Sequence, residues 1–260
     1  MINTELKTVI ISGGLGLLGR EFAKVLSGKY NVILLDVRDK VDNYYKGEET
    51  HYFYTFSCDI TNESQITQSI EYINEKWGHI DIVINCAAYN EQPDENIDNS
   101  FENYSLDRWK KTLDVNLTGS FLLSRECIQY MLKNKTEKVG FKGTIINIAS
   151  DLGIIASDQS IYENGYKKPP GYGVSKVGLI YLTKYIAGYY RDKIKSVCLV
   201  PGSVYNGQSD ILKKNLENRI PIGRLASKDE YNGAIKFLCS QDSDYMQGQS
   251  LVMDGGRTIW

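Results

Sequence analysis

Short uninterrupted runs of Val, Ile and Leu, separated by longer amphipathic stretches, limit the folds open to this chain of 260 residues. A run without polar alternation indicates a strand buried on both faces, as in a parallel sheet covered by helices. Repeated strand–helix–strand units require right-handed crossovers. We therefore expect an α/β fold with a Rossmann-type doubly wound parallel sheet in three layers, α/β/α. The expected strands are Thr8–Ile11, Val32–Leu35, Tyr52–Phe56, Ile80–Ile84, Thr144–Ile148, Val197–Val200 and Leu251–Met253, and the expected helices are Arg20–Leu26, Ser64–Trp77, Leu106–Leu132, Tyr172–Tyr190 and Tyr231–Leu238.

The domain organisation follows from the same pattern. The sequence contains no linker, internal repeat or low-complexity tract, so we expect one domain over residues 1–260. A chain of this size buries enough surface to fold without disulfides or a structural metal. Two segments interrupt the regular alternation, Asn90–Asn103 and Ile155–Gly171. Long irregular loops inside a compact domain are usually functional.

Charge and composition exclude several functional classes. Thirty basic residues balance thirty-two acidic ones, so we expect no nucleic-acid partner. Five cysteines without a Cys-x-x-Cys motif favour a reducing compartment, and neither His51 nor His79 has metal-ligand spacing, so no metal is expected. No apolar run is long enough to span a membrane, and the first residues lack the regions of a signal peptide. A cytoplasmic location and no membrane partner are therefore expected.

A glycine cluster lies between the first strand and the first helix, in the segment Ser12-Gly-Gly-Leu-Gly-Leu-Leu-Gly19. Gly13 permits a tight turn, Gly16 lets backbone amides approach a pyrophosphate, and Gly19 allows close packing of helix on sheet. Leu17 and Leu18 open the helix, whose N-terminal dipole favours an anion. This placement predicts a dinucleotide-binding turn.

Asp36 ends the second expected strand. A carboxylate at that point accepts hydrogen bonds from the adenosine ribose hydroxyls, and it would repel a 2′-phosphate. The sequence therefore predicts NAD as cofactor, with NADP less favoured. Arg38, two residues further on, could soften this preference.

The motif Tyr-x-x-x-Lys places a hydroxyl and an ammonium one helical turn apart, where the charge favours tyrosinate. The sequence contains three copies of this motif. Only the copy Tyr172/Lys176 follows a strand that ends in a serine, Ser150, and only this copy lies near the carboxyl ends of the strands, where ligands bind in open α/β sheets. We therefore predict Tyr172 as the proton-transfer residue, with Lys176 as its partner. The three copies are Tyr72/Lys76, Tyr172/Lys176 and Tyr189/Lys193.

Together these motifs resemble the short-chain dehydrogenase/reductase family, in its compact single-domain branch, from Thr8 to Gly256. The resemblance implies that Ser150 hydrogen-bonds the substrate oxygen, that Tyr172 transfers the proton, and that Lys176 holds the ribose and tunes Tyr172. It also implies that Asn116 supports a water relay. Three further segments resemble those of the family: Cys58-Asp59-Ile60, which would contact the adenine, Pro201-Gly202 with Val204, which would lie on the nicotinamide side, and the tail Gly248–Gly256. The segment Asn85-Cys86-Ala87-Ala88 after the fourth strand is a partial match, because the family has Asn and Gly where this chain has Cys86 and Ala88.

The glycine spacing departs from the compact branch and is similar to that of longer, epimerase-type relatives. Those relatives carry a larger C-terminal substrate domain, for which this chain has no room. An NAD-dependent oxidoreductase that interconverts a secondary alcohol and a ketone is therefore expected. The alternatives are a sugar-nucleotide epimerase or dehydratase, and a non-catalytic NAD-binding regulatory protein.

The segment between Ser150 and Tyr172 is longer than is usual in the family, and its part Ser157–Pro170 is polar, with two tyrosines and two lysines. A polar rim favours a small polyol, sugar or anionic substrate. The segment is similar to that of oxidoreductases in flagellin-glycan and surface-sugar pathways, and the alternatives are a subunit contact or a disordered loop. We expect Ser203–Asn218 to form a mobile lid, in which the family's usual Thr is absent. The resemblance also implies a homotetramer or dimer.

Overall fold

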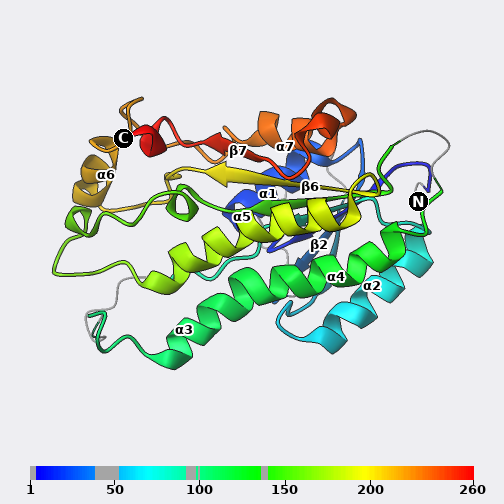
Figure 1. Ribbon diagram of the computed structural model, residues 1–260, viewed down its shortest axis with the longest axis horizontal. Helices are drawn as coiled ribbons and strands as arrows, with labels where there is room; N and C mark the ends of the chain where they lie inside the picture. The colour runs from blue at the N-terminus through cyan, green and yellow to red at the C-terminus, as the bar shows by residue number, and fades with distance from the viewer. Residues whose placement is uncertain (1–3, 39–52, 92–97, 99, 136–139) are drawn as a thin grey trace.

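The computed structural model describes residues 4–38, 53–91, 98, 100–135 and 140–260. Within these ranges, parallel strands form one sheet in the order β3-β2-β1-β4-β5-β6-β7 (Figure 1). This order and the parallel pairing confirm the predicted doubly wound sheet. The strands are β1 (Thr8–Ser12), β2 (Asn31–Asp36), β3 (Phe53–Ser57), β4 (Ile82–Asn85), β5 (Gly143–Ile148), β6 (Ile194–Pro201) and β7 (Ser250–Met253).

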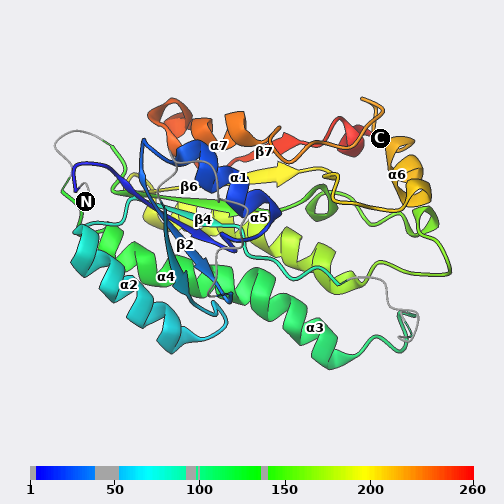
Figure 2. The ribbon, with the colours of Figure 1, turned by 180° about the vertical axis from the view of Figure 1, so that it is seen from behind.

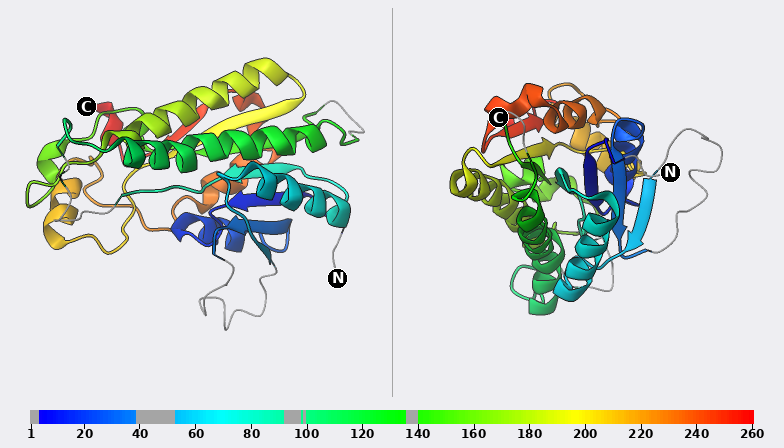
Figure 3. Two further views of the ribbon diagram at one scale, coloured as in Figure 1. Left: turned by 90° about the horizontal axis from the view of Figure 1, so that it is seen from below. Right: turned by 90° about the vertical axis from the view of Figure 1, so that its right-hand side faces the viewer.

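Two layers of helices cover the sheet, as Figures 2 and 3 show. Val9 and Ile11 of β1 pack into the core under α1 (Leu17–Leu26) and α7 (Asn232–Cys239). Ile10, which points to the opposite face, packs into the core under α2 (Glu63–Trp77), α4 (Gly119–Met131) and α5 (Pro170–Tyr190). The central strands are therefore buried on both faces, which explains their lack of polar alternation.

The expected elements differ from the observed ones mainly at their ends. The predicted strand Tyr52–Phe56 corresponds to β3, and Tyr52 itself lies outside the described residues. The predicted helix Leu106–Leu132 is continuous but contains α3 (Leu106–Leu113), a π-helical turn (Asp114–Thr118) and α4. The π-helical turn contains Asn116, and hydrophobic periodicity does not reveal it.

Strand register brings the predicted site together. Ser12 of β1 lies beside Asn85 of β4, and Asn85 lies beside Asn147 of β5. Since all these strands run the same way, their carboxyl ends meet at one edge of the sheet, where open α/β folds bind ligands. The Ser12 hydroxyl accepts hydrogen bonds from the amides of Cys86 (3.2 Å) and Ala87 (3.3 Å). The turns that follow β1 and β4 are thereby tied together.

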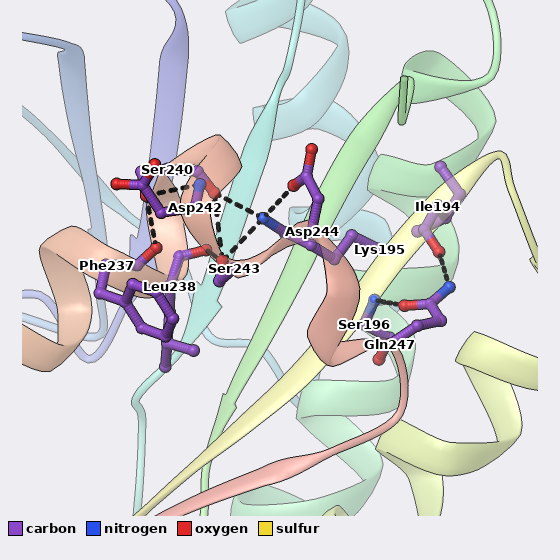
Figure 4. A network of polar contacts seen from close by, with 10 residues as sticks. All are labelled: Ile194, Lys195, Ser196, Phe237, Leu238, Ser240, Asp242, Ser243, Asp244 and Gln247. Atoms are coloured by element: carbon purple, nitrogen blue, oxygen red, sulfur yellow. Dashed lines mark hydrogen bonds and ion pairs between the residues drawn. The ribbon is translucent and has the colours of Figure 1, made fainter. Parts of the chain in front are cut away.

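The opposite edge of the sheet contains a buried cation. The Lys195 side chain, at the start of β6, is 2% exposed. Its ammonium donates to the Ser240 carbonyl (2.8 Å), the Ser243 hydroxyl (3.0 Å) and the Asp244 carboxylate (2.8 Å), as Figure 4 shows. Three acceptors meet its three donors, which offsets the cost of burying the charge. This network fastens β6 to the 3-10 turn Gln241–Met246.

Candidate active site

A cavity of about 2100 Å³ opens at the carboxyl edge of the sheet. Ligand pockets usually measure roughly 300–1,000 Å³, so this one has room for a dinucleotide and a substrate together. Two predicted site residues do not line it, Asn85 and Asn116. Those that do are Gly13, Gly16, Leu17, Leu18, Gly19, Asp36, Asp59, Ile60, Ala87, Ser150, Tyr172, Lys176, Pro201, Gly202 and Val204.

The glycine turn fits a pyrophosphate. Gly13 has a φ of +62°, and a Cβ there would lie 2.6 Å from Cα of Ala87. A Cβ on Gly19 would lie 2.3 Å from the Gly13 carbonyl oxygen, so only glycine permits this packing. Gly16 caps α1 and makes no side-chain cap bond. The first residues of α1, Leu17 and Leu18, line the cavity, where the N-terminal dipole of the helix favours an anion.

Asp36 stands at the end of β2, on the adenosine side of the cavity. Its carboxylate accepts from the Leu15 amide at 3.0 Å and from the Arg38 Nε at 3.0 Å. Burial alone would raise the pKa of Asp36, but the hydrogen bonds from Arg38 and Leu15 outweigh it and hold the pKa below its usual value. The carboxylate is charged at neutral pH, as ribose binding requires. Arg38 forms an ion pair with the Asp36 carboxylate at 3.0 Å.

Asn85 lies beneath the cavity floor. Its side chain is buried and donates to Ser124 Oγ and Asn147 Oδ1, each at 2.8 Å. Asn147 in turn donates to Thr183 Oγ1 at 2.8 Å. This chain of amides and hydroxyls links β4 and β5 to α4 and α5. Asn85 therefore supports the part of the cavity wall to which Ala87 contributes.

The predicted catalytic side chains meet on one wall of the cavity. Ser150 follows β5, while Tyr172 and Lys176 lie one turn apart on α5. The Lys176 ammonium donates to the Ile148 carbonyl at 2.9 Å and lies 5.5 Å from the centre of the Tyr172 ring. Ser150 and Tyr172 both line the cavity, and Ser150 acts on the pKa of Tyr172. A reacting oxygen between Ser150 and Tyr172 would be in reach of both hydroxyls.

The protonation states differ from the simple expectation for a Tyr–Lys pair. Burial raises the pKa of Tyr172 to about 12, although the hydrogen bond with Ser150 lowers it. Burial also lowers the pKa of Lys176 to about 8. The Lys176 ammonium points to the Ile148 carbonyl, so its charge does not offset the desolvation of Tyr172. In the protein without ligands, Tyr172 is therefore a proton donor at neutral pH.

Asn116 is fully buried behind the wall. Its amide accepts from the Tyr89 amide (2.6 Å) and donates to the Tyr89 carbonyl (3.1 Å) and to Ser175 Oγ (3.1 Å). Ser175 donates to the Tyr172 carbonyl at 2.7 Å. Asn116 therefore connects the segment after β4 to the backbone of the catalytic helix. The predicted water relay stays a prediction.

A buried ion pair, which no sequence motif reveals, lies beside Ser150. The Ser150 hydroxyl donates to Asp151 Oδ1 at 2.7 Å, and Arg257 Nη1 lies 2.8 Å from Asp151 Oδ2. Arg257 also donates to Ser203 Oγ at 3.1 Å, next to the Pro201-Gly202 turn. No sequence motif joins Asp151 to Arg257, because they are 106 residues apart.

The long segment before Tyr172 forms part of the cavity wall, to which Gln159, Tyr162, Tyr166 and Lys168 contribute. Helix α6 (Asp210–Glu217) lies within the predicted lid and packs on the 3-10 turn Gln159–Ile161 of this long segment. Asn215 of α6 donates to the Ile161 carbonyl at 2.8 Å, and Arg219 pairs with Asp158 at 2.7 Å. The insert and the expected lid therefore lie against each other.

Lys168 is a second cation at Tyr172. Its ammonium lies 4.7 Å from the centre of the Tyr172 ring. In the sequence, Lys168 precedes Tyr172, whereas Lys176 follows it. The three residues form Lys-x-x-x-Tyr-x-x-x-Lys in the sequence, but Lys168 precedes α5, so helical spacing alone does not place it beside Tyr172. In the described ranges, no group of three or more His, Cys, Asp or Glu side chains is placed to hold a metal ion, and no helix there is long and apolar enough to cross a membrane.

Comparisons with known proteins agree with this geometry. Residues 18–258 match a family model described as enoyl-(acyl carrier protein) reductase. The structure is similar to that of a short-chain dehydrogenase from Leptospira borgpetersenii with bound NAD+ (TM-score 0.85, 32% identity, 98% of this chain and 93% of that chain). Trans-4-hydroxycyclohexanecarboxylate dehydrogenase of Sinomonas cyclohexanicum is 29% identical over 97% of this chain and 93% of its own length. Glucose 1-dehydrogenase 2 of Bacillus subtilis is 27% identical over 78% of this chain and 74% of its own.

Proposed function

The chain belongs to the short-chain dehydrogenase/reductase family of NAD(P)-dependent oxidoreductases, and we propose that it uses NAD to interconvert a secondary alcohol and a ketone on a small polar, sugar-like substrate. One observation carries this proposal: Ser150, Tyr172 and Lys176 lie together in the same cavity as the glycine turn and Asp36. The residues proposed for proton transfer and for dinucleotide binding therefore lie within one cavity.

The residues of the cavity divide the work of the reaction. The glycine turn and the start of α1 would hold the pyrophosphate, while Lys176 would hold the nicotinamide ribose. When bound, the dinucleotide accepts or supplies a hydride. Ser150 hydrogen-bonds the substrate oxygen and orients it, and Tyr172 gives a proton to that oxygen in reduction or takes one from it in oxidation. The hydrogen bond from Ser150 thus holds the substrate oxygen next to the Tyr172 hydroxyl, with which it exchanges a proton.

NAD is preferred over NADP in this proposal because of Asp36. Its carboxylate lies at the adenosine side of the cavity and stays charged. A 2′-phosphate there would meet a like charge at close range, whereas ribose hydroxyls would donate to it. Arg38 already pairs with Asp36, so the arginine does not stand as a separate phosphate site.

A polar substrate is proposed because polar side chains of the insert, including Gln159 and Lys168, line the cavity beside Tyr172. One relative is named for glucose and another for a hydroxycyclohexanecarboxylate, both small polar alcohols. A sugar or sugar derivative fits this wall better than a steroid or lipid, which would need an apolar rim. We extend the proposal to a role in surface-sugar biosynthesis in the cytoplasm; all five cysteines are free thiols, as a reducing compartment allows.

We also propose a homodimer or homotetramer. Helix α5 exposes an apolar stripe at helical spacing, and α3 and α4 add exposed Leu106 and Phe121. Contiguous exposed apolar surface of this kind favours association with a second copy. The residues of the stripe are Val174, Val177, Tyr181, Tyr185 and Tyr189.

A substrate screen tests the function directly. The protein is incubated with NAD and a panel of sugars, polyols, hydroxy acids, simple alcohols and steroids, and NADH is followed by absorbance. We expect NADH only with small polar alcohols. Turnover of steroids alone would contradict the proposal, and conversion of a sugar nucleotide without net NADH would support the epimerase or dehydratase alternative.

A further inference from the structure

Lys168 occupies a prepared position at the substrate end of the cavity. Its backbone is held on both sides by one side chain: Gln159 Oε1 accepts from the Lys168 amide at 2.8 Å, and Gln159 Nε2 donates to the Lys168 carbonyl at 3.2 Å. Pro169 and Pro170 follow and restrict the backbone up to the start of α5. The side chain is thus directed from a rigid base toward Tyr172.

The ammonium of Lys168 has more N–H donors than the described residues around it supply acceptors for. It donates to the Asn90 amide oxygen and lies over the Tyr172 ring, 4.7 Å from the ring centre. In the described part of the chain no carboxylate lies within ion-pairing distance of it. An ammonium has three donors, and a half-buried one that meets a single neutral acceptor favours an added anion.

Neighbouring charges are already matched. Glu91, the carboxylate whose charge acts on Lys168, receives a 2.6 Å bond from Arg108 and a 3.1 Å bond from the Tyr104 hydroxyl. Arg257 is paired with Asp151. Burial lowers the pKa of Lys168 to about 8 even though Glu91 opposes the change, so the ammonium is charged at pH 7 yet poorly solvated.

We propose that Lys168 binds a carboxylate of the substrate, so that the preferred substrates are hydroxy acids, such as acidic sugars, whose carbinol group lies at Ser150 and Tyr172. One ammonium matches the charge of one monoanion. The ammonium would anchor the acid while the hydroxyl reaches the Tyr172 oxygen. This inference rests on the proposed function for its account of the reacting end, but carboxylate binding is measurable without turnover.

The test measures binding in a protein that cannot complete the reaction. Tyr172→Phe keeps the ring beside Lys168 and removes the hydroxyl. With NAD+ bound and at pH 7, this variant is titrated by calorimetry with matched pairs, D-galacturonate with D-galactose and D-gluconate with D-glucitol, and with D-glucose 6-phosphate. Lys168→Met and Lys168→Gln are added in the same background. Lys167→Met is the matched control, because Lys167 is the adjacent lysine and is exposed.

We expect at least one carboxylate to bind more tightly than its neutral partner, and Lys168→Met and Lys168→Gln to weaken it roughly ten- to hundredfold, the loss for a charge-assisted hydrogen bond. Neutral partners and the Lys167→Met control should change less than about twofold. Unchanged NAD+ affinity shows that each variant is folded.

Three results overturn the inference: carboxylates that bind no better than their neutral partners, equal weakening of acids and neutral compounds, or tighter binding of the phosphate ester. Carboxylate binding through Lys168 combined with no NADH production from any alcohol would contradict the proposed function and leave this inference intact. The two failures are therefore distinguishable.

Discussion

Arg257 and Asp151 form a buried ion pair, with 2.8 Å between Nη1 and Oδ2 and side-chain exposures of 6% and 3%. The other carboxylate oxygen of Asp151 accepts the Ser150 hydroxyl at 2.7 Å. Ser150, which we propose orients the substrate oxygen, is thus held by a carboxylate, and that carboxylate is held by the C-terminal segment. A buried pair of this kind costs little when both partners are present and much when one is removed.

Arg257→Met should therefore lower the free energy of unfolding by about 3–5 kcal/mol, because Asp151 is left as an unpaired buried charge. Urea denaturation measures this loss. The double variant Asp151→Leu/Arg257→Met should recover most of it, since no charge is then stranded. An equal loss in the single and double variants would show that the side chains matter through packing instead.

Tyr172→Phe should reduce kcat by about 10²–10⁴-fold, the usual contribution of a positioned general acid or base. NAD+ binding and thermal stability should stay unchanged, because only the hydroxyl is lost. The matched control is Tyr72→Phe, which alters another Tyr-x-x-x-Lys pair, with Lys76 Nζ 3.3 Å from the Tyr72 hydroxyl on an exposed helix surface. Normal turnover of Tyr172→Phe would remove Tyr172 from the mechanism.

Asp36→Ser should shift cofactor preference toward NADPH by at least about tenfold, because the like charge is removed and the ion pair between Asp36 and Arg38 is lost in the same step. Calorimetric titration of NADH and NADPH into both proteins measures the ratio. Tighter binding of NADPH than NADH by the unaltered protein would contradict the assignment of NAD.

Ketone reduction should fall as the pH rises through about 8. Tyr172, whose pKa is about 12, remains a proton donor throughout, whereas Lys176, whose pKa is about 8, loses its charge and its strongest hold on the ribose. The pH profile of kcat/KM for NADH reports this group in the free enzyme. In Lys176→Arg the cation stays charged, so the alkaline decline should disappear even if the rate is lower.

Tyr181→Glu should dissociate the proposed oligomer, because it places a charge in the centre of the apolar stripe on α5. Light scattering coupled to size exclusion gives the mass of each species. Tyr245→Glu is the control, since Tyr245 is fully exposed on a different surface. An unaltered protein that is monomeric at micromolar concentration would refute the oligomer.

The fold could be predicted because its signal is local and repeated: each buried strand is a short apolar run, and each covering helix has an apolar face. The tight turn between β1 and α1 was also predictable, since Gly13, Gly16 and Gly19 lie close together in the sequence; its binding of a cofactor stays a prediction. Asn85 and Asn116 were placed near the cofactor and the proton path by resemblance, yet their side chains lie behind the cavity wall.

What the sequence could not show depends on distant pairs. Asp151 and Arg257 meet only after the sheet and the C-terminal segment are assembled. Lys168 was one of two adjacent lysines in a polar segment, and only the folded backbone directs one of them to Tyr172. The pKa of Tyr172 also depends on burial, which a motif does not measure.

The all-parallel strand order has a consequence for how the protein is made. Among the strands that the structure describes, no neighbours form a hairpin, so each of these pairings closes a long loop, and such topologies fold slowly. The residues proposed to bind the adenosine, from Gly13 to Asp59, are all synthesised before Ser150, Tyr172 and Lys176. During translation the nascent chain can thus build its nucleotide-binding half first, and the catalytic wall is added to it as β5, α5 and β6 emerge from the ribosome.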